Sequence, residues 1–142
     1  MRNKTVVHLL SYLCLLLVAF AFSGCSLSGA PIPEGMDSES TIAMAQDIAV
    51  SLSKGEYDAV AEQFSDEMKA QLSAQSLQDA LSKEINKRGE VTKFLSHSIR
   101  GGLDDEAGEY AVVVLVCKCE NSTSTFTISI DTDMKICGLY MK

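Results

Sequence analysis

The sequence feature that most constrains the fold is the apolar run from Tyr110 to Cys119, which reads Tyr-Ala-Val-Val-Val-Leu-Val-Cys-Lys-Cys. It is rich in β-branched residues, which suit a pleated sheet surface. Side chains alternate along a strand, so both faces of this strand carry apolar residues. One face holds Val113, Leu115 and Cys117, and the other holds Val112, Val114 and Val116. The run therefore predicts a central β-strand that is covered on both faces.

The next segment, Thr123–Asp131, alternates strictly between apolar and hydroxyl side chains, which predicts a half-buried strand. A two-residue turn at Asn121-Ser122 would place Leu115 opposite Ile128 and set six apolar residues on one face. The other predicted pairs are Cys117 with Phe126 and Val113 with Ile130. A slip of one residue would move every apolar side chain to the wrong face, so the pattern predicts this register.

A last strand is predicted at Lys135–Lys142, after a three-residue loop at Thr132–Met134. This loop would pair Ile130 with Ile136 and Phe126 with Tyr140. It would leave three apolar side chains on the second face, Cys137, Leu139 and Met141. Because an antiparallel sheet normally keeps one polar face, we expect the protein's own loops, a ligand or a partner subunit to cover the second face.

Three helices are predicted ahead of the sheet from apolar residues at helical spacing. They cover Ser38–Ser53, Tyr57–Leu72, and a segment that starts at Ser73 or Ser76 and ends at Lys87-Arg88-Gly89. Ser65 precedes two acidic residues and is typical of a helix N-cap, so the second helix is expected to break there. A first strand at Val91–Arg100 and an acidic hairpin loop at Gly101–Gly108 complete the prediction. The fold class is α+β, with N-terminal helices packed on a four-stranded antiparallel meander.

The N-terminus has the pattern of a targeting segment. A basic n-region precedes an apolar stretch, Ser11–Phe22, that is too short to span a bilayer comfortably as a stable helix. The following residues, Phe22-Ser23-Gly24-Cys25, resemble a lipobox, the cleavage site of bacterial lipoprotein signal peptides. The resemblance implies that residues 1–24 are removed and that Cys25 carries a lipid at the extracytoplasmic face of the cell membrane. An ordinary secretory signal and an uncleaved membrane anchor are the alternatives.

The charge of the chain argues against partners that carry negative charge. The net charge is −7, and removal of Arg2 and Lys4 with the leader would leave 10 basic residues against 19 acidic ones, a net charge of −9. This balance argues against nucleic acid, and also against an electrostatic attachment to anionic lipid. Residues 25–37 predict the lipidated cysteine and a Pro- and Gly-containing tether that reaches roughly 40 Å when extended. Residues 38–142 predict a single domain.

Three cysteines fall in the predicted domain, an odd number for an exported protein. Cys117 and Cys119 share a strand face at roughly 6.6–7 Å, the limit for a disulfide, and Cys137 is expected on the opposite face. Buried reduced thiols are therefore expected. We expect no metal site and no cofactor, because the mature chain would keep a single histidine. The acidic turns Asp104-Asp105-Glu106 and Asp131-Thr132-Asp133 lack the spacing of a calcium loop.

No nucleophile with an adjacent base is marked in the sequence, so no catalytic residue is predicted. His97 lies on the same predicted strand face as Leu95 and Ile99, where it is either a hydrogen-bonded structural residue or the polar group of a pocket. The candidate pocket or cavity residues are His97, Tyr57, Tyr110, Tyr140 and Phe64.

The order of helices followed by a meander is accompanied by three short motifs. They are Gly55-Glu56-Tyr57-Asp58-Ala59-Val60, Phe64-Ser65-Asp66-Glu67-Met68-Lys69 and Lys135-Ile136-Cys137-Gly138-Leu139. Together they resemble a bacterial domain-of-unknown-function family with a nuclear-transport-factor-like (cystatin-like) fold, over roughly Thr41 to the C-terminus. The resemblance implies a curved sheet wrapped by helices, often with a conical cavity and often dimeric through the sheet. The family pattern has a glycine where this chain has Met134, and an aromatic residue near Leu81.

We therefore expect a membrane-anchored, non-catalytic module that binds a small apolar ligand or an envelope protein. Two alternatives belong to other classes. One is a small cavity enzyme of the isomerase or hydratase type that acts on an apolar molecule. The other is a purely structural homodimer formed through the sheet.

Overall fold

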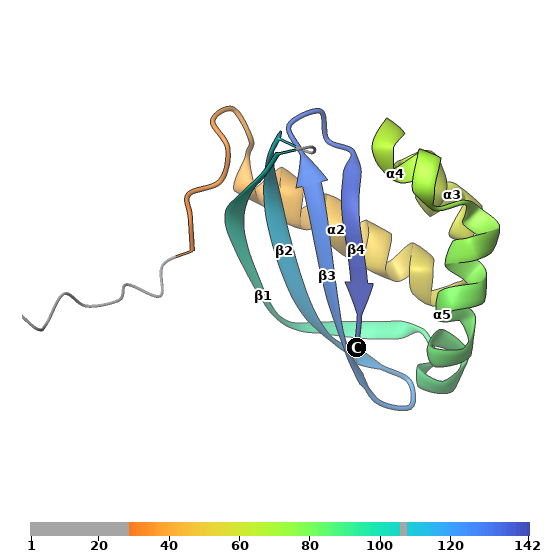
Figure 1. Ribbon diagram of the computed structural model, residues 1–142. Helices are drawn as coiled ribbons and strands as arrows, with labels where there is room; N and C mark the ends of the chain where they lie inside the picture. Colours follow the sequence, from red (N-terminus) through yellow and green to blue (C-terminus); the bar gives the residue numbers. More distant parts are fainter. Residues whose placement is uncertain (1–28, 106–107) are drawn as a thin grey trace, which may run out of the picture.

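The computed structural model describes residues 29–105 and 108–142, so the predicted signal peptide and lipobox lie outside the described residues. In this part of the chain, helices precede a four-stranded antiparallel sheet with strand order β1-β2-β3-β4 (Figure 1). The helices are α2 (Ser38–Ser53), α3 (Tyr57–Glu62), α4 (Asp66–Gln71) and α5 (Ala74–Arg88). The strands are β1 (Val91–Asp104), β2 (Gly108–Cys119), β3 (Thr123–Asp131) and β4 (Ile136–Met141). The predicted α+β meander is confirmed, and none of these helices has the length and apolar character needed to cross a bilayer.

The helices begin where side chains satisfy free backbone N–H groups. The Asp37 carboxylate accepts a hydrogen bond from the Ser40 amide at 2.8 Å, which lowers the pKa of Asp37. Ser65 caps α4 in the same way by accepting from the Met68 amide at 3.2 Å, and Ser73 caps α5. The predicted second helix therefore breaks at Ser65 into α3 and α4, because the cap starts a new helix.

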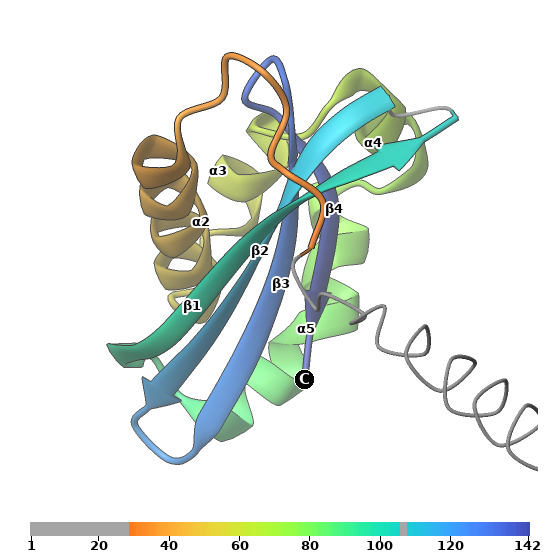
Figure 2. The same ribbon diagram turned by 90° about the vertical axis from the view of Figure 1, so that its left-hand side faces the viewer.

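Helices α2, α3 and α5 pack on one face of the sheet, and Figure 2 shows α2 lying along this face. From the sheet, the core takes Val113, Leu115, Cys117, Phe126, Ile128, Ile130 and Ile136. From the helices, it takes Ala45, Ile48, Ala49, Leu52, Tyr57, Val60, Phe64, Leu77 and Ile85. The core thus lies between α2, α3 and α5 on one side and the three strands β2–β4 on the other.

We call the other side of the sheet the open face, and Figure 1 looks onto it. The strand registers place residues of all four strands on it. They are Lys93, Ser96, Ser98, Arg100, Gly102 and Asp104 of β1; Tyr110, Val112, Val114, Val116 and Lys118 of β2; Thr123, Thr125, Thr127, Ser129 and Asp131 of β3; and Cys137, Gly138 and Tyr140 of β4, followed by Lys142. Its centre is a row of valines on β2 flanked by hydroxyl side chains on β3. The face is therefore less apolar than the sequence analysis predicted.

The pairing of β2 with β3 differs from the predicted register by two residues. Leu115 pairs with Phe126 instead of Ile128, and the last pair is Lys118 with Thr123. Four residues, 119–122, connect that pair instead of the predicted two. Because side chains alternate with a period of two, the shift leaves each of them on its predicted face.

The predicted pairing of β3 with β4 is correct at its start and wrong beyond it. Ile130 pairs with Ile136 as predicted, but the register then shifts by one residue at Cys137. This β-bulge places an extra residue in β4, so Tyr140 no longer lies opposite Phe126. Cys137 stays on the open face. The two other side chains predicted there, Leu139 and Met141, pack against the core instead.

The hairpin between the first two strands is longer than predicted. Pairing continues past the pair of Gly101 with Ala111 and ends at the pair of Asp104 with Gly108. The predicted loop, residues 101–108, is therefore wrong in its extent. Most of that segment forms the end of a two-stranded ribbon.

Residues 29–37, predicted as part of a free tether, contact the domain, and we call them the arm. The Gly101 amide donates a hydrogen bond of 2.7 Å to the Ala30 carbonyl, and Pro33 is buried. A Cβ atom on Gly101 would lie 1.9 Å from the Pro31 carbonyl oxygen, so glycine is required for this contact. Part of the segment predicted as a tether therefore packs against the domain.

Candidate functional site

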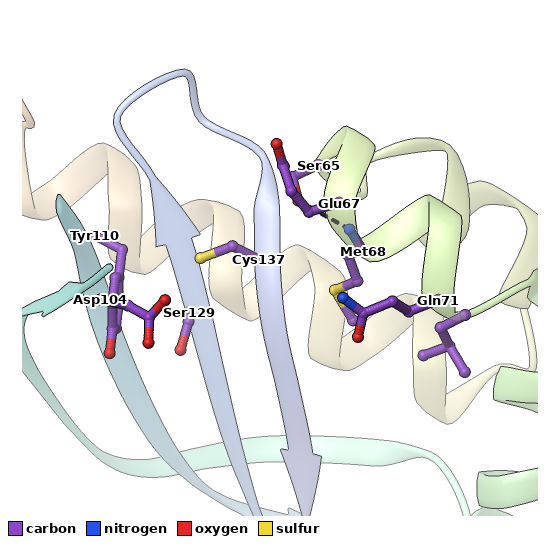
Figure 3. A pocket seen from close by; sticks show the side chains of 9 residues that line it. Ser65, Glu67, Met68, Gln71, Asp104, Tyr110, Ser129 and Cys137 are labelled. Carbon is purple, nitrogen blue, oxygen red and sulfur yellow. Dashed lines mark hydrogen bonds between the residues drawn. The ribbon is translucent and has the colours of Figure 1, made fainter. Parts of the chain in front are cut away.

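A groove of about 390 Å³ opens on the open face beside β4 (Figure 3). One wall comes from α4, the opposite wall comes from the end of the β1–β2 hairpin, and Ser129 and Cys137 lie between them. The lining residues are Ser65, Glu67, Met68, Gln71, Leu72, Asp104, Tyr110, Ser129 and Cys137. Five elements, α4 and the four strands, therefore meet in one depression.

Backbone hydrogen bonds hold the α4 wall against the edge of the sheet. The Ser65 amide donates to the Ile136 carbonyl at 2.9 Å, and the Ile136 amide donates to the Gln63 carbonyl at 2.9 Å. Phe64 lies between these contacts with 1% of its surface exposed, which fixes the start of α4 to the core. The bulge in β4 turns the Cys137 side chain into the groove.

The groove is acidic and partly apolar. Glu67 of α4 and Asp104 of β1 line it from opposite walls, and its described lining includes no lysine or arginine. Met68, Leu72 and Tyr110 supply apolar surface. These two properties suit a ligand, or a partner side chain, that carries a positive charge on an apolar stem.

The Cys137 thiol is poorly suited to nucleophilic chemistry. Its pKa is raised to about 11, first by burial and then by the negative charges of Asp131, Asp104 and Glu67. Because the thiolate is the reactive form, a thiol with this pKa is protonated and inert at neutral pH. Cys137 is therefore a lining group of the groove.

The five candidate site residues do not share one cavity. Tyr110 lines the groove, whereas Tyr57 and Phe64 belong to the core, where burial raises the pKa of Tyr57. Tyr140 lies on the open face with 61% of its surface exposed. His97 is exposed and pairs with a core residue of β2, so it lies on the opposite side of the sheet from the groove.

Sequence reasoning missed the α4 wall and the position of Cys137. The signal for α4 was present, since the cap at Ser65 and the acidic residues after it were recognised, but they were interpreted only as a helix start. The bulge at Cys137 has no signal in the pattern of apolar residues, because neighbouring Ile136 and Leu139 are both apolar.

The remaining thiols lie in the core. Cys117 and Cys119 are free and buried, and the pKa of Cys117 is raised to about 11 by burial and then by Cys119. The Cys119 and Ser124 side chains are 3.5 Å apart, Sγ to Oγ. Within residues 29–105 and 108–142, no three His, Cys, Asp or Glu side chains are arranged to hold a metal ion.

Comparison with known proteins supports the fold and assigns a family. The NMR structure of a protein from Ruminococcus gnavus ATCC 29149 matches with a TM-score of 0.67 and 24% sequence identity, over 78% of this chain and 95% of that chain. No curated protein matches this chain. The model of a family described as protein of unknown function (DUF3887) matches residues 45–139, a range that includes all nine lining residues of the groove. The chain therefore belongs to the DUF3887 family.

Proposed function

We propose that the protein is a lipid-anchored, extracytoplasmic, non-catalytic binding module, and that the groove is its binding site. In this proposal Cys25 carries the lipid, and the α+β domain is of the nuclear-transport-factor-like (cystatin-like) type. The observation that carries the proposal is the groove itself, in which side chains from five elements, acidic and apolar groups among them, surround one space. Its volume of about 390 Å³ falls within the usual range of small-molecule sites.

The chemistry of the groove favours binding over turnover. Its thiol has a pKa of about 11, and the candidate base His97 lies on the other side of the sheet. A cavity enzyme needs an acid–base group beside the reacting atoms, and the polar candidates are dispersed. A purely structural homodimer would leave the acidic lining of the groove without a role.

The chemical class of ligand follows from the two walls. An ammonium group would lie near Glu67 and Asp104, while its apolar stem would contact Met68, Leu72 and Tyr110. Exposed charge pairs contribute roughly 0.2–1 kcal/mol each, so the two carboxylates together would add at most about 2 kcal/mol of affinity. Most of the remaining affinity would come from the apolar stem.

Two matched probes test this proposal, hexylamine and hexanol, titrated into the protein while backbone amides are followed by two-dimensional NMR. Hexylamine should shift the amides of Met68, Tyr110 and Cys137, and hexanol should shift them at higher concentration, because it lacks the charge. Ser129→Phe should abolish both effects by filling the groove. Thr127→Phe is the control, since this residue lies on the same strand and face outside the lining.

The proposal fails if neither probe perturbs groove amides in the wild-type protein. It also fails if Ser129→Phe and Thr127→Phe behave alike. Turnover of a substrate that depends on Tyr110 would replace the proposal with the enzymatic alternative.

A further inference from the structure

The open face carries a concentration of basic side chains at the end away from the groove. Three of the ten lysine and arginine residues in the described chain lie there, all exposed: Lys93, Lys118 and Lys142. Arg100, on the same face, pairs with Val112, which pairs with the groove residue Ser129, so it lies at the groove end. The acidic residues of the same face, Asp104 and Asp131, lie at the groove end. The lysines of this face are therefore separated along the strands from its aspartates, although the protein as a whole is acidic.

These basic side chains are not neutralised by neighbouring carboxylates. Lys93 pairs directly with Lys118 across β1 and β2, an arrangement of like charges that destabilises a sheet. Among the described residues, the ion pair present is Arg88 with Glu84, elsewhere in the molecule. The nearby Glu120 turns toward the end of α5, where its carboxylate accepts a hydrogen bond from the Glu90 amide at 3.2 Å.

The arm leads the N-terminal part of the chain onto this same face. Gly29 packs against the Arg100 side chain, because a Cβ atom on Gly29 would lie 2.6 Å from the Arg100 Cβ. The adjacent residue Ala30 is bridged to Gly101. Cys25 lies four positions before Gly29, a reach of at most about 14 Å. A lipid on Cys25 would therefore lie near the groove end of the open face and keep this face beside the headgroups.

We propose that the basic end of the open face, formed by Lys93, Lys118 and Lys142, rests on the anionic headgroups of the membrane that anchors the protein. The proposal depends on the lipid anchor of the proposed function and goes beyond it by fixing the orientation of the domain. The lysines lie about 26 Å along the strands from the groove, and the arm reaches the groove end of the face, so the anchor and the lysines would hold the two ends of the open face to the membrane. The net charge of the chain conceals this arrangement, which is why composition alone argued against an electrostatic contact.

The test uses the full-length protein purified from bacterial membranes, with its mass measured first to establish acylation. It is then reconstituted into vesicles of phosphatidylcholine, with or without phosphatidylglycerol, that contain a headgroup spin label. A fluorophore is attached at Tyr140→Cys on the open face or at Gln78→Cys on the exposed side of α5. The Tyr140→Cys probe should be quenched and the Gln78→Cys probe should not, with the difference increased by phosphatidylglycerol.

A charge-matched pair of variants separates the basic face from net charge. Lys93→Gln/Lys118→Gln/Lys142→Gln should reduce the docked population by about fivefold for each side chain removed. The control, Lys54→Gln/Lys69→Gln/Lys83→Gln, removes three exposed lysines elsewhere and should leave quenching unchanged.

Two results overturn the proposal in distinguishable ways. An unacylated mass overturns the anchor and, with it, this orientation. An acylated mass with equal quenching of the two probes, or with equal loss in the two triple variants, overturns the orientation and leaves the anchor and the groove intact.

Discussion

Replacing Phe64 with alanine tests whether this residue belongs to the core or to a pocket. Phe64 has 1% of its surface exposed and packs within the core cluster, next to the backbone contacts that hold α4 at β4. Substitutions of this kind usually cost about 3–5 kcal/mol. We expect the lower end, about 3 kcal/mol, because α4 is a six-residue helix that buries none of its own residues and can move toward the space left behind.

The loss would be measured as the free energy of unfolding in urea, followed by circular dichroism, with the slope of the transition unchanged. Phe64→Leu should cost about 1 kcal/mol, since it refills most of the space. Tyr140→Ala, at a site that is 61% exposed, is the control and should change stability by less than about 0.5 kcal/mol. A loss below about 1 kcal/mol for Phe64→Ala would show that the side chain lines an open cavity, and would refute the core assignment.

Four further predictions concern the arm, the groove thiol and the groove wall. Gly101→Ala should displace the arm, because the new Cβ would meet the Pro31 carbonyl oxygen, and faster amide exchange at residue 101 would report the lost hydrogen bond to Ala30; unchanged exchange would contradict it. With a pKa of about 11 against an ordinary 9.0, the Cys137 thiol should react with alkylating agents at pH 8 about 100-fold more slowly than a free cysteine, as thiol titration would measure. Because the unfolded chain loses this proton first, Cys137 should lower the free energy of unfolding between about pH 9 and 11 by at most about 1.4 kcal/mol per pH unit. Cys117 should act in the same way, so the stability of Cys137→Ala should still fall, but less steeply than that of the wild type. Ser65→Ala should cost about 1 kcal/mol by removing the cap of α4, and an unchanged urea midpoint would argue against the cap.

The helices were predictable because their boundaries depend on local chemistry. Ser65 and Ser73 cap the helices that follow them, and Gly89 ends α5 with a φ of 79°. Each of these signals is contained within a few residues of sequence, so neighbouring elements are not needed to interpret it.

The strand pairing was less predictable, because loops and bulges decide it. The alternation in Thr123–Asp131 fixes which side chains face the core, but shifts of two residues satisfy it equally well. The turn before β4 shows the same difficulty. Met134 occupies it with a φ of 58°, a conformation that favours glycine, which is consistent with the glycine that the family pattern implies at this position.

The groove and the basic face could not be derived from composition. The groove depends on how the bulge at Cys137, the end of the β1–β2 hairpin and the position of α4 combine in three dimensions. The basic face depends on the strand registers that bring Lys93, Lys118 and Lys142 together. A net charge of −7 describes the whole chain and carries no information about which face holds the lysines.

The most direct measurement is the native mass of the acylated protein, extracted from bacterial membranes without denaturation, for the wild type and Ser129→Phe. If the groove is the binding site, the wild type should carry a mass beyond its chain and lipid, and Ser129→Phe should lack it. A mass of chain and lipid alone for both proteins would contradict a binding role for the groove.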